Sequence, residues 1–406
     1  TRKEERAKAR KTKKEAKVEV PKSTIIKGED PEKSLLIISS PGTSTPPGRM
    51  ENGKWRGSYG GLEAIAGWCA KAFAKRGFDV TLALSMDSDP SYYPENVKLV
   101  PTVFSGIIGG IPEKQAWDVI KKRIDLEGWK GPVIDHSHGG WTKTVQKERS
   151  AIWAYVLHDM PQHLGAPPPV KYPGIVTPSL NGAMEYAAKF QNAGYKLDPN
   201  KDEVALLGCI AKVVHHGIPL EEYPFSQKGG DRYLFLGRIQ ELKGVHLALE
   251  VCKSLGVSLD IAGTDTHYGN PETNLYVQKI KKACDGEIIK YHSEVSHEKK
   301  VDLLQNAKAT IVSSVFSEPL GLTSPESQAC GTPVITSAMG GLPETLREGK
   351  TGRSCQTLGE MRNTILDLEE GSWRPLRSAC REWIESYWTV EKMVDRYEVL
   401  LKSEPW

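Results

Sequence analysis

Short apolar runs alternate with helix-length amphipathic segments along most of the chain. Leu35-Leu36-Ile37-Ile38 is an apolar run of the length of a buried strand, and a loop rich in glycine and proline follows it. A helix is predicted from about Leu62 to Arg76, because its apolar residues recur at three- and four-residue spacing. Gly77 stands where a helix C-terminal cap is expected, and the next strand is predicted at Val80 to Leu84.

The same β-α alternation continues in two series, separated by a turn-rich segment at 219–231. This order predicts mainly parallel sheets covered by helices on both faces, with ligands at the carboxyl ends of the strands. Two terminal helices are predicted within 375–405. The further strands are predicted at 97–103, 133–136, 154–157 and 175–176 in the first series, and at 233–236, 259–262, 288–291, 309–312 and 333–336 in the second.

A chain of 406 residues is longer than one hydrophobic core usually organises, so two domains are expected. Two consecutive α/β domains joined near residue 220 would leave a cleft between two sets of strand ends, which suits a reaction of two substrates. The predicted division is a basic N-terminal arm at 1–33, a first α/β domain at 34–218, a second at 219–375 and terminal helices at 376–406.

Composition is that of a soluble globular protein, with 39% hydrophobic and 26% charged residues. No apolar run approaches the roughly 20 residues of a membrane span. The seven cysteines are scattered and form no CxxC pair, which argues against a disulfide framework and a zinc site and favours a reducing, cytoplasmic location. The formal net charge of +3 is uneven, because residues 1–17 carry nine Lys or Arg against three Glu.

The richest stretch for chemistry runs from Ser314 to Val334, where a predicted strand leads through a loop into a helix. Ser324 is expected to cap this helix, with Pro325 at its first position and Glu326 in its first turn. Free amides at the start of the helix, next to Gly321, would offer a seat for a phosphate or for sugar hydroxyls.

Glu318 and Glu326 stand eight positions apart across this loop-to-helix junction, so both can point into one pocket and accept hydrogen bonds from a diol. The alternative without a binding role is that Glu326 only caps its helix and that Glu318 is a surface residue. Taken alone, an isolated pair of glutamates favours that alternative.

The order of several motifs changes this interpretation. The two glutamates are followed by Ala-Cys-Gly-Thr-Pro-Val-Ile and by Gly340-Gly-Leu-Pro-Glu344, and are preceded by Phe-Leu-Gly-Arg238 and Lys243-Gly. With Gly-Gly-Leu-Glu63, His158-Asp and Glu-Gly-Lys-Thr-Gly at 348–352, this ordered set resembles the family-four (group 1) retaining glycosyltransferases over about residues 35–400. The resemblance implies a GT-B fold, in which two Rossmann-like domains face each other across a deep cleft and C-terminal helices pack back on the first domain.

The resemblance also implies roles for individual residues. Arg238 and Lys243 would bind the donor diphosphate and stabilise the leaving nucleotide, Glu318 would contact hydroxyls of the donor sugar, and Glu326 would hold the ribose diol. His158 would lie beside the reacting sugar. The further donor-binding residues implied are Gly60 and Gly61 in the loop of the first domain, and Leu320, Gly321, Leu322 and Thr323, whose amides would cradle the sugar and distal phosphate.

Residue chemistry supports the two cations, since a guanidinium and an ammonium each form strong charge-assisted hydrogen bonds with phosphate oxygens. Solvated charges at a strand end are the alternative for Arg238 and Lys243. For His158 the alternative is a histidine satisfied by Asp159.

No metal and no cofactor are expected, the nucleoside diphosphate sugar being a substrate. His136 and His138 have the alternation of a ligand pair, but no third ligand follows at a suitable spacing, and His215-His216 resembles the interdomain segment of the family. Two positions depart from the family pattern: Ser293 replaces a frequent glycine near the nucleobase, and Leu320 a frequent phenylalanine.

The function predicted from the sequence is transfer of a sugar from a nucleoside diphosphate sugar to an acceptor hydroxyl, with retention at the anomeric carbon. A different possibility is an assembly or interaction protein whose arm at 1–17 grips nucleic acid or an acidic partner, with vestigial sugar-nucleotide binding. A sugar-nucleotide epimerase or a phosphorylase of the same fold is a third. The acceptor, donor sugar and nucleobase are not specified.

Overall fold

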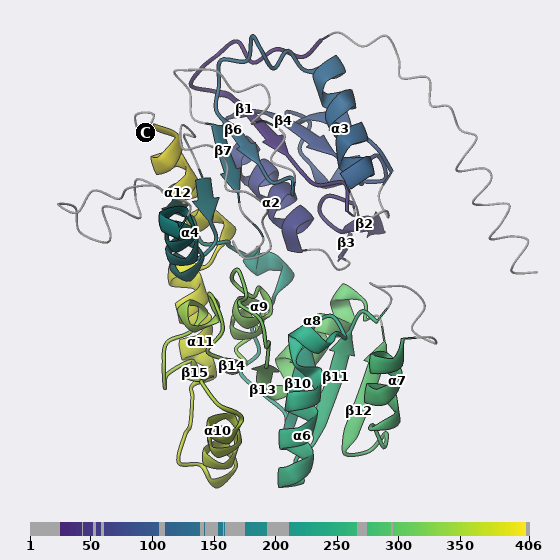
Figure 1. The fold of residues 1–406 in the computed structure, drawn as a ribbon, viewed down its shortest axis with the longest axis vertical. Coiled ribbons are helices and arrows are strands. Elements are labelled where there is room, and N and C mark those ends of the chain that lie inside the picture. Colours follow the sequence, from purple (N-terminus) through teal and green to yellow (C-terminus); the bar gives the residue numbers. More distant parts are fainter. Residues whose placement is uncertain are drawn as a thin grey trace, which may run out of the picture.

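Two mainly parallel sheets occupy separate halves of the molecule (Figure 1). The computed structural model describes residues 25–42, 44–51, 54–57, 61–104, 110–138, 142, 153–156, 158, 175–192, 211–265, 274–293 and 295–402. The basic arm at 1–17 and Gly60 lie outside these residues, so the interpretations that concern them stay predictions.

The first sheet has seven parallel strands in the order β5-β4-β1-β6-β7-β8-β9. A separate two-stranded antiparallel hairpin, β2 (Gly48–Glu51) with β3 (Lys54–Gly57), follows β1. The strands of the sheet are β1 (Ser34–Ile38), β4 (Asp79–Leu84), β5 (Lys98–Pro101), β6 (Val133–Asp135), β7 (Trp153–Val156), β8 (Ile175–Thr177) and β9 (Lys212–Val213); its helices are α2 (Gly61–Lys75), α3 (Gly110–Arg123) and α4 (Leu180–Asn192), and η1 (Pro90–Tyr92) is a 3₁₀ turn.

The apolar run of strand β1, Leu35 to Ile38, is buried on both faces of the sheet. Leu35 and Ile37 belong to the core that includes α2, whereas Leu36 and Ile38 belong to the core that includes Trp117 of α3. Successive side chains of a strand point to opposite faces, so a strand covered on both sides has to be apolar at every position.

The second sheet has six parallel strands in the order β12-β11-β10-β13-β14-β15. Its strands are β10 (Arg232–Leu236), β11 (Leu259–Gly263), β12 (Ile289–Ser293), β13 (Ala307–Val312), β14 (Val334–Ser337) and β15 (Gly352–Cys355). The helices are α6 (Val245–Leu255), α7 (Leu275–Lys282), α8 (His297–Asn306), α9 (Thr323–Ala329) and α10 (Leu358–Glu370), with 3₁₀ turns η4 (Leu220–Glu222), η5 (Glu241–Lys243) and η6 (Leu342–Thr345).

The terminal helices α11 (Arg377–Tyr387) and α12 (Val390–Lys402) join the two halves along one side of the molecule (Figure 1). Helix α11 packs against α9 of the second half, and α12 packs against α2 of the first. Arg76, just after α2, forms ion pairs with Asp395 and Glu398 of α12. The expectation that the terminal helices return to the first domain is therefore met by α12.

The expected α/β fold is confirmed, and the predicted strands lie within two residues of the observed ones. The helix predicted at 62–76 is α2, and the two terminal helices are α11 and α12. The periodicity of the sequence missed the short strands β9 and β15 and the β2–β3 hairpin. Within the described residues, no helix combines the length and the apolar character needed to cross a bilayer.

The two halves meet at the carboxylate of Glu344, in η6 of the second half. Its oxygens accept hydrogen bonds from the amides of Leu180 and Asn181 at the start of α4, each 2.8 Å long, and Oε2 lies 2.9 Å from Nε2 of His215. The hydroxyl of Tyr387 in α11 lies 3.2 Å from Nδ1 of His215. One carboxylate thus joins the start of a helix in the first half, the interdomain segment and, through His215, a terminal helix.

We expect Glu344→Ala to destabilise the protein by roughly 1–3 kcal/mol, because the amides of α4 lose a charged acceptor at the positive end of their helix. Differential scanning calorimetry should show the loss as a lower melting temperature. Glu250→Ala, which alters an exposed residue of α6, is the control and should melt like the wild type. An unchanged melting temperature for Glu344→Ala would show that this contact does not hold the halves together.

Candidate active site

The candidate site lies at the carboxyl ends of β10 and β13, which pair in parallel and therefore end side by side. Arg238 follows β10 by two residues, and Lys243 is the last residue of η5. Glu318 lies in the loop that follows β13. The fold thus brings residues from distant parts of the sequence to one edge of the sheet.

Lys243 and Glu318 form a buried ion pair, with Nζ 2.6 Å from Oε1. Their side chains are only 15% and 7% exposed. The hydroxyl of Ser314 donates to the same carboxylate oxygen, and the ammonium lies 4.7 Å from the ring centre of Phe316. These partners compensate for the cost of burying a carboxylate. Since Glu318 is buried, the alternative that it is a surface residue is wrong.

Gly340 and Gly341 hold the backbone of Glu318. The amide of Gly341 donates to the carbonyl of Glu318 over 2.7 Å. Gly340 has a positive φ of 62°, and a Cβ there would come within 2.2 Å of the same carbonyl oxygen. Only glycine allows this approach, so the glycine pair of the sequence serves to place the glutamate.

Helix α9 begins earlier than the sequence predicted. Its first residue is Thr323 and its N-cap is Leu322, so the prediction of Ser324 as the cap and Pro325 as the first helical residue is wrong. The reason is that Gly321, with φ of 88°, turns the chain directly into the helix. Ser324 is instead buried, and its hydroxyl lies 2.6 Å from that of Thr345.

The amides at the start of α9 are partly occupied. Those of Ser324 and Glu326 already donate to the carbonyls of Gly321 and Leu322. In the part of the chain that the structure describes, the amides of Leu322 and Thr323 find no acceptor. The occupied amides lie outside the expected cradle at 320–323, whose role in donor binding stays a prediction; the side chain of Leu320 is buried.

Glu326 is buried and bonded by two side chains, Tyr223 and Lys300, each 2.7 Å from Oε1. Neither partner follows from sequence spacing, since the three residues come from different elements. Gly61, at the start of α2, faces this region across the domain boundary, because a Cβ there would lie 3.3 Å from Cδ1 of Leu322. Gly61 and Leu322, from the two parts of the predicted donor site, therefore lie close together.

Three histidines lie ring against ring at the carboxyl ends of the first sheet. Nδ1 of His136, just after β6, lies 2.9 Å from Nε2 of His158, which follows β7. The ring of His216 stacks on that of His158 at 5.1 Å between centroids. The expected alternative, pairing of His158 with Asp159, lies outside the described residues, and the described partner of His158 is His136.

Burial keeps these rings uncharged. It lowers the pKa of His136 and of His216 from 6.5 to about 3, and lowers the pKa of His158 well below 6.5, with the neighbouring histidines adding to the effect. The contact between His136 and His158 therefore joins two uncharged rings, one of which donates to the other. Asp135 fixes the loop beside them, since its buried carboxylate accepts hydrogen bonds from Ser137 and Thr142.

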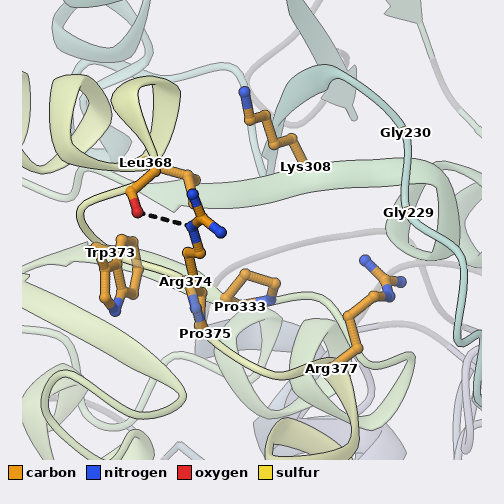
Figure 2. Close-up of a pocket in the computed structure, with 10 residues that line it drawn as sticks. Gly229, Gly230, Lys308, Pro333, Leu368, Trp373, Arg374, Pro375 and Arg377 are labelled. Atoms are coloured by element: carbon orange, nitrogen blue, oxygen red, sulfur yellow. Dashed lines mark hydrogen bonds between the residues drawn. The ribbon is translucent and has the colours of Figure 1, made fainter.

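A cavity of about 480 Å³ elsewhere in the second half was not foreseen (Figure 2). It lies at the amino ends of the strands, where Lys308 is the second residue of β13 and Pro333 precedes β14, on the opposite edge of the sheet from Glu318. Its three cations have partners: Lys308 pairs with Glu369, Arg374 donates to the carbonyl of Gly371, and Arg377 donates to four backbone carbonyls. This cavity is therefore separate from the candidate site.

Among the described residues, no three His, Cys, Asp or Glu side chains are grouped as ligands of a metal ion. His136 instead pairs with His158, and His215 with Glu344. Ser293, the departure from the family pattern, is the last residue of β12 and is exposed at the carboxyl edge of the second sheet. Six cysteines are described, and all six carry free thiols.

Comparisons with known proteins find similarity in the second half of the chain. Residues 221–384 match the family model described as glycosyl transferases, group 1. The glycogen synthase of Mycobacterium tuberculosis is 32% identical over 181 residues, which cover 41% of this chain and 42% of that protein. The chain thus aligns with less than half of that relative's length, and the motifs at 60–63 and 158–159 lie outside the family match.

Solved structures resemble nearly the whole chain. Sucrose-phosphate synthase from Thermosynechococcus elongatus has a TM-score of 0.63 at 18% identity, covering 91% of this chain and 98% of its own. The Anabaena protein HepE in complex with UDP and glucose has a TM-score of 0.62 at 15% identity, covering 91% and 99%. Identities this low show the fold alone, and that fold is the expected GT-B arrangement.

We predict that the buried histidines make stability sensitive to acid. A pKa near 3 in the folded protein, against about 6.5 when unfolded, means that His216 contributes stability above pH 6.5 and loses it as the pH falls towards 3. Between pH 7.5 and 5.5 the wild type should lose about 1.4 kcal/mol more than His216→Phe, which keeps a stacking ring but does not titrate.

Urea titrations at the two pH values measure this difference. Asp135 and Glu222, whose pKa values burial raises, act in the opposite direction, but they are present in both proteins and cancel in the comparison. Equal losses of unfolding free energy in wild type and His216→Phe would contradict the prediction.

Proposed function

We propose that this chain, whose residues 221–384 belong to the group 1 glycosyl transferases, is a retaining hexosyltransferase that uses a nucleoside diphosphate sugar. The observation that carries the proposal is the buried pair of Lys243 and Glu318 at the carboxyl ends of β10 and β13. In open α/β sheets, ligands bind at that edge. The pair supplies an ammonium for phosphate and a carboxylate for sugar hydroxyls within 2.6 Å of each other.

In the proposed reaction, the bond between the anomeric carbon and the phosphate oxygen breaks, and the acceptor oxygen bonds to the same carbon from the same face. The acceptor proton passes to an oxygen of the leaving nucleoside diphosphate. No protein nucleophile is needed for these two bond changes. The protein contributes orientation of the two substrates and stabilisation of the charge that develops on phosphate.

Arg238 and Lys243 are the residues proposed to stabilise that charge. An ammonium has three donors, and Lys243 uses one on Glu318, so others can reach phosphate oxygens without breaking the ion pair. Glu318 is proposed to accept from a hydroxyl of the donor sugar with its second oxygen. Held in this way, sugar and phosphate would lie on either side of one ion pair.

His158 is proposed to contact the donor sugar from the first half. It is half-buried, uncharged and held by His136, so it can donate or accept a hydrogen bond without adding positive charge. Gly60, Gly61 and the amides of 320–323 are proposed to surround the diphosphate and sugar. Neither metal nor cofactor is part of the proposal.

The nucleotide of the donor sugar can be identified by measuring binding directly. The HepE structure similar to this chain contains UDP and glucose, which makes uridine diphosphate sugars the first donors to test. Isothermal titration calorimetry with UDP-, GDP- and ADP-sugars, followed by a hydrolysis assay, tests the proposal. Binding without turnover for any acceptor would instead favour an interaction protein with vestigial donor binding, and binding of none would refute the proposal.

The free thiols of the six described cysteines are compatible with a reducing compartment. We include a cytoplasmic location in the proposal on that ground. Fractionation of cells that express the tagged chain tests it.

We expect Arg238→Ala and Lys243→Ala each to lower transfer by at least ~100-fold, the scale of losing one donor that stabilises developing charge. The rate of nucleotide release from the donor sugar is the measurement. Lys299→Ala is the matched control, because Lys299 is a half-exposed lysine of α8 paired with Asp302, away from the ion pair.

Folding must be checked for Lys243→Ala, since it leaves the Glu318 carboxylate buried without its cation. Arg238→Ala does not remove that ion pair, so it is the sharper of the two variants. Near-normal turnover by folded Arg238→Ala would remove Arg238 from the mechanism.

A further inference from the structure

Glu326, Tyr223 and Lys300 form a closed triangle of hydrogen bonds. The Tyr223 hydroxyl and the Lys300 ammonium each lie 2.7 Å from Oε1 of Glu326, and the ammonium lies 2.9 Å from the Tyr223 hydroxyl oxygen. The side chains of Lys300 and Glu326 are 18% and 9% exposed. The bonds from Tyr223 and from Lys300 thus end on the same oxygen, Oε1, of a largely buried carboxylate.

The triangle is held from several sides. Lys300 belongs to α8, Glu326 to α9, and Tyr223 follows η4 at the boundary between the halves. The ring of Tyr223 is buried, meets the ring of His297 edge-on at 5.4 Å, and its carbonyl accepts from Arg381 over 2.8 Å. Burial and the adjacent Glu326 raise the pKa of Tyr223 well above 10, so its hydroxyl keeps the proton that it donates.

The hydrogen bonds that Tyr223 and Lys300 make occupy only part of the acceptor capacity of the Glu326 carboxylate. An ionised carboxylate offers about four lone-pair directions, two on each oxygen. Tyr223 and Lys300 occupy both directions on Oε1, and among the described residues no donor reaches Oε2. Two acceptor directions on one oxygen match the two hydroxyls of a vicinal diol.

We infer that Lys300 and Tyr223 are positioning residues that fix one oxygen of Glu326 and turn the other toward the ribose diol of the donor nucleotide. The inference rests on the proposed function and deepens it, because it names what gives the site its preference for a ribonucleotide. Lys300 also balances the charge of Glu326, so the carboxylate does not repel the donor's diphosphate. The bland alternative is that Lys300 only stabilises the fold.

The test compares a nucleoside diphosphate with its 2′-deoxy analogue, using the base that the donor screen selects. Dissociation constants come from calorimetry on the full chain. The wild type should bind the ribonucleotide about tenfold or more tightly, as expected for one hydrogen bond to a charged acceptor. In Lys300→Met this ratio should fall to within about threefold, and Glu326→Gln should show the same loss.

Two further variants distinguish a role of Lys300 and Tyr223 in positioning Glu326 from a role in stabilising the fold. Lys299→Met removes the neighbouring, half-exposed lysine of the same helix and should keep the wild-type ratio. Tyr223→Phe keeps the ring and the Lys300 cation but removes one hydrogen bond to Oε1, so it should lower the ratio by a smaller factor. A purely structural defect would instead weaken both nucleotides equally.

The outcomes are distinct. A folded Lys300→Met that discriminates like the wild type overturns the inference, and so does equal weakening of both nucleotides. If the wild type binds nucleotide but does not discriminate, the inference fails while the proposed function stands. If the wild type binds none of the nucleotides, the proposed function fails and the inference with it.

Discussion

The parallel pairing of β10 with β13 is the constraint on which the site depends. It brings Lys243 and Glu318, which are 75 positions apart, to one edge of the sheet and within 2.6 Å. A buried carboxylate is costly unless a charge and hydrogen bonds compensate for it, so Glu318 can be buried only where Lys243 and Ser314 are already in place. The backbone of Gly340 and Gly341, in the loop after β14, completes the support.

Charge balance explains why two carboxylates can stand in a site proposed to bind a diphosphate. Each is paired with its own lysine, Glu318 with Lys243 and Glu326 with Lys300. A paired carboxylate still accepts hydrogen bonds from sugar or ribose hydroxyls, but its field is largely cancelled by the nearby ammonium. Arg238 follows β10 at the same edge of the sheet, and a guanidinium offers several donors in a planar fork that fits phosphate oxygens.

The sequence predicted the sheets well, because strands buried on both faces are apolar throughout and are separated by helices of regular periodicity. Strand β15 (Gly352–Cys355) was not predicted, because its residues Gly-Arg-Ser-Cys form no apolar run. Motif order pointed to Glu318 and Glu326 but could not supply Lys300 or Tyr223, which reach Glu326 only through tertiary packing. The start of α9 was misjudged because a positive φ at Gly321, not a side-chain cap, sets it.

Two adjacent histidines of the interdomain segment, His215 and His216, contact different halves of the molecule. His215 contacts Glu344 of the second half, whereas the next ring, His216, stacks on His158 of the first. One peptide links the two contacts, so the same short stretch of backbone places the ring that meets Glu344 and the ring that stacks on His158. The support between the two halves and the packing of the histidine proposed to contact the sugar therefore come from adjacent residues.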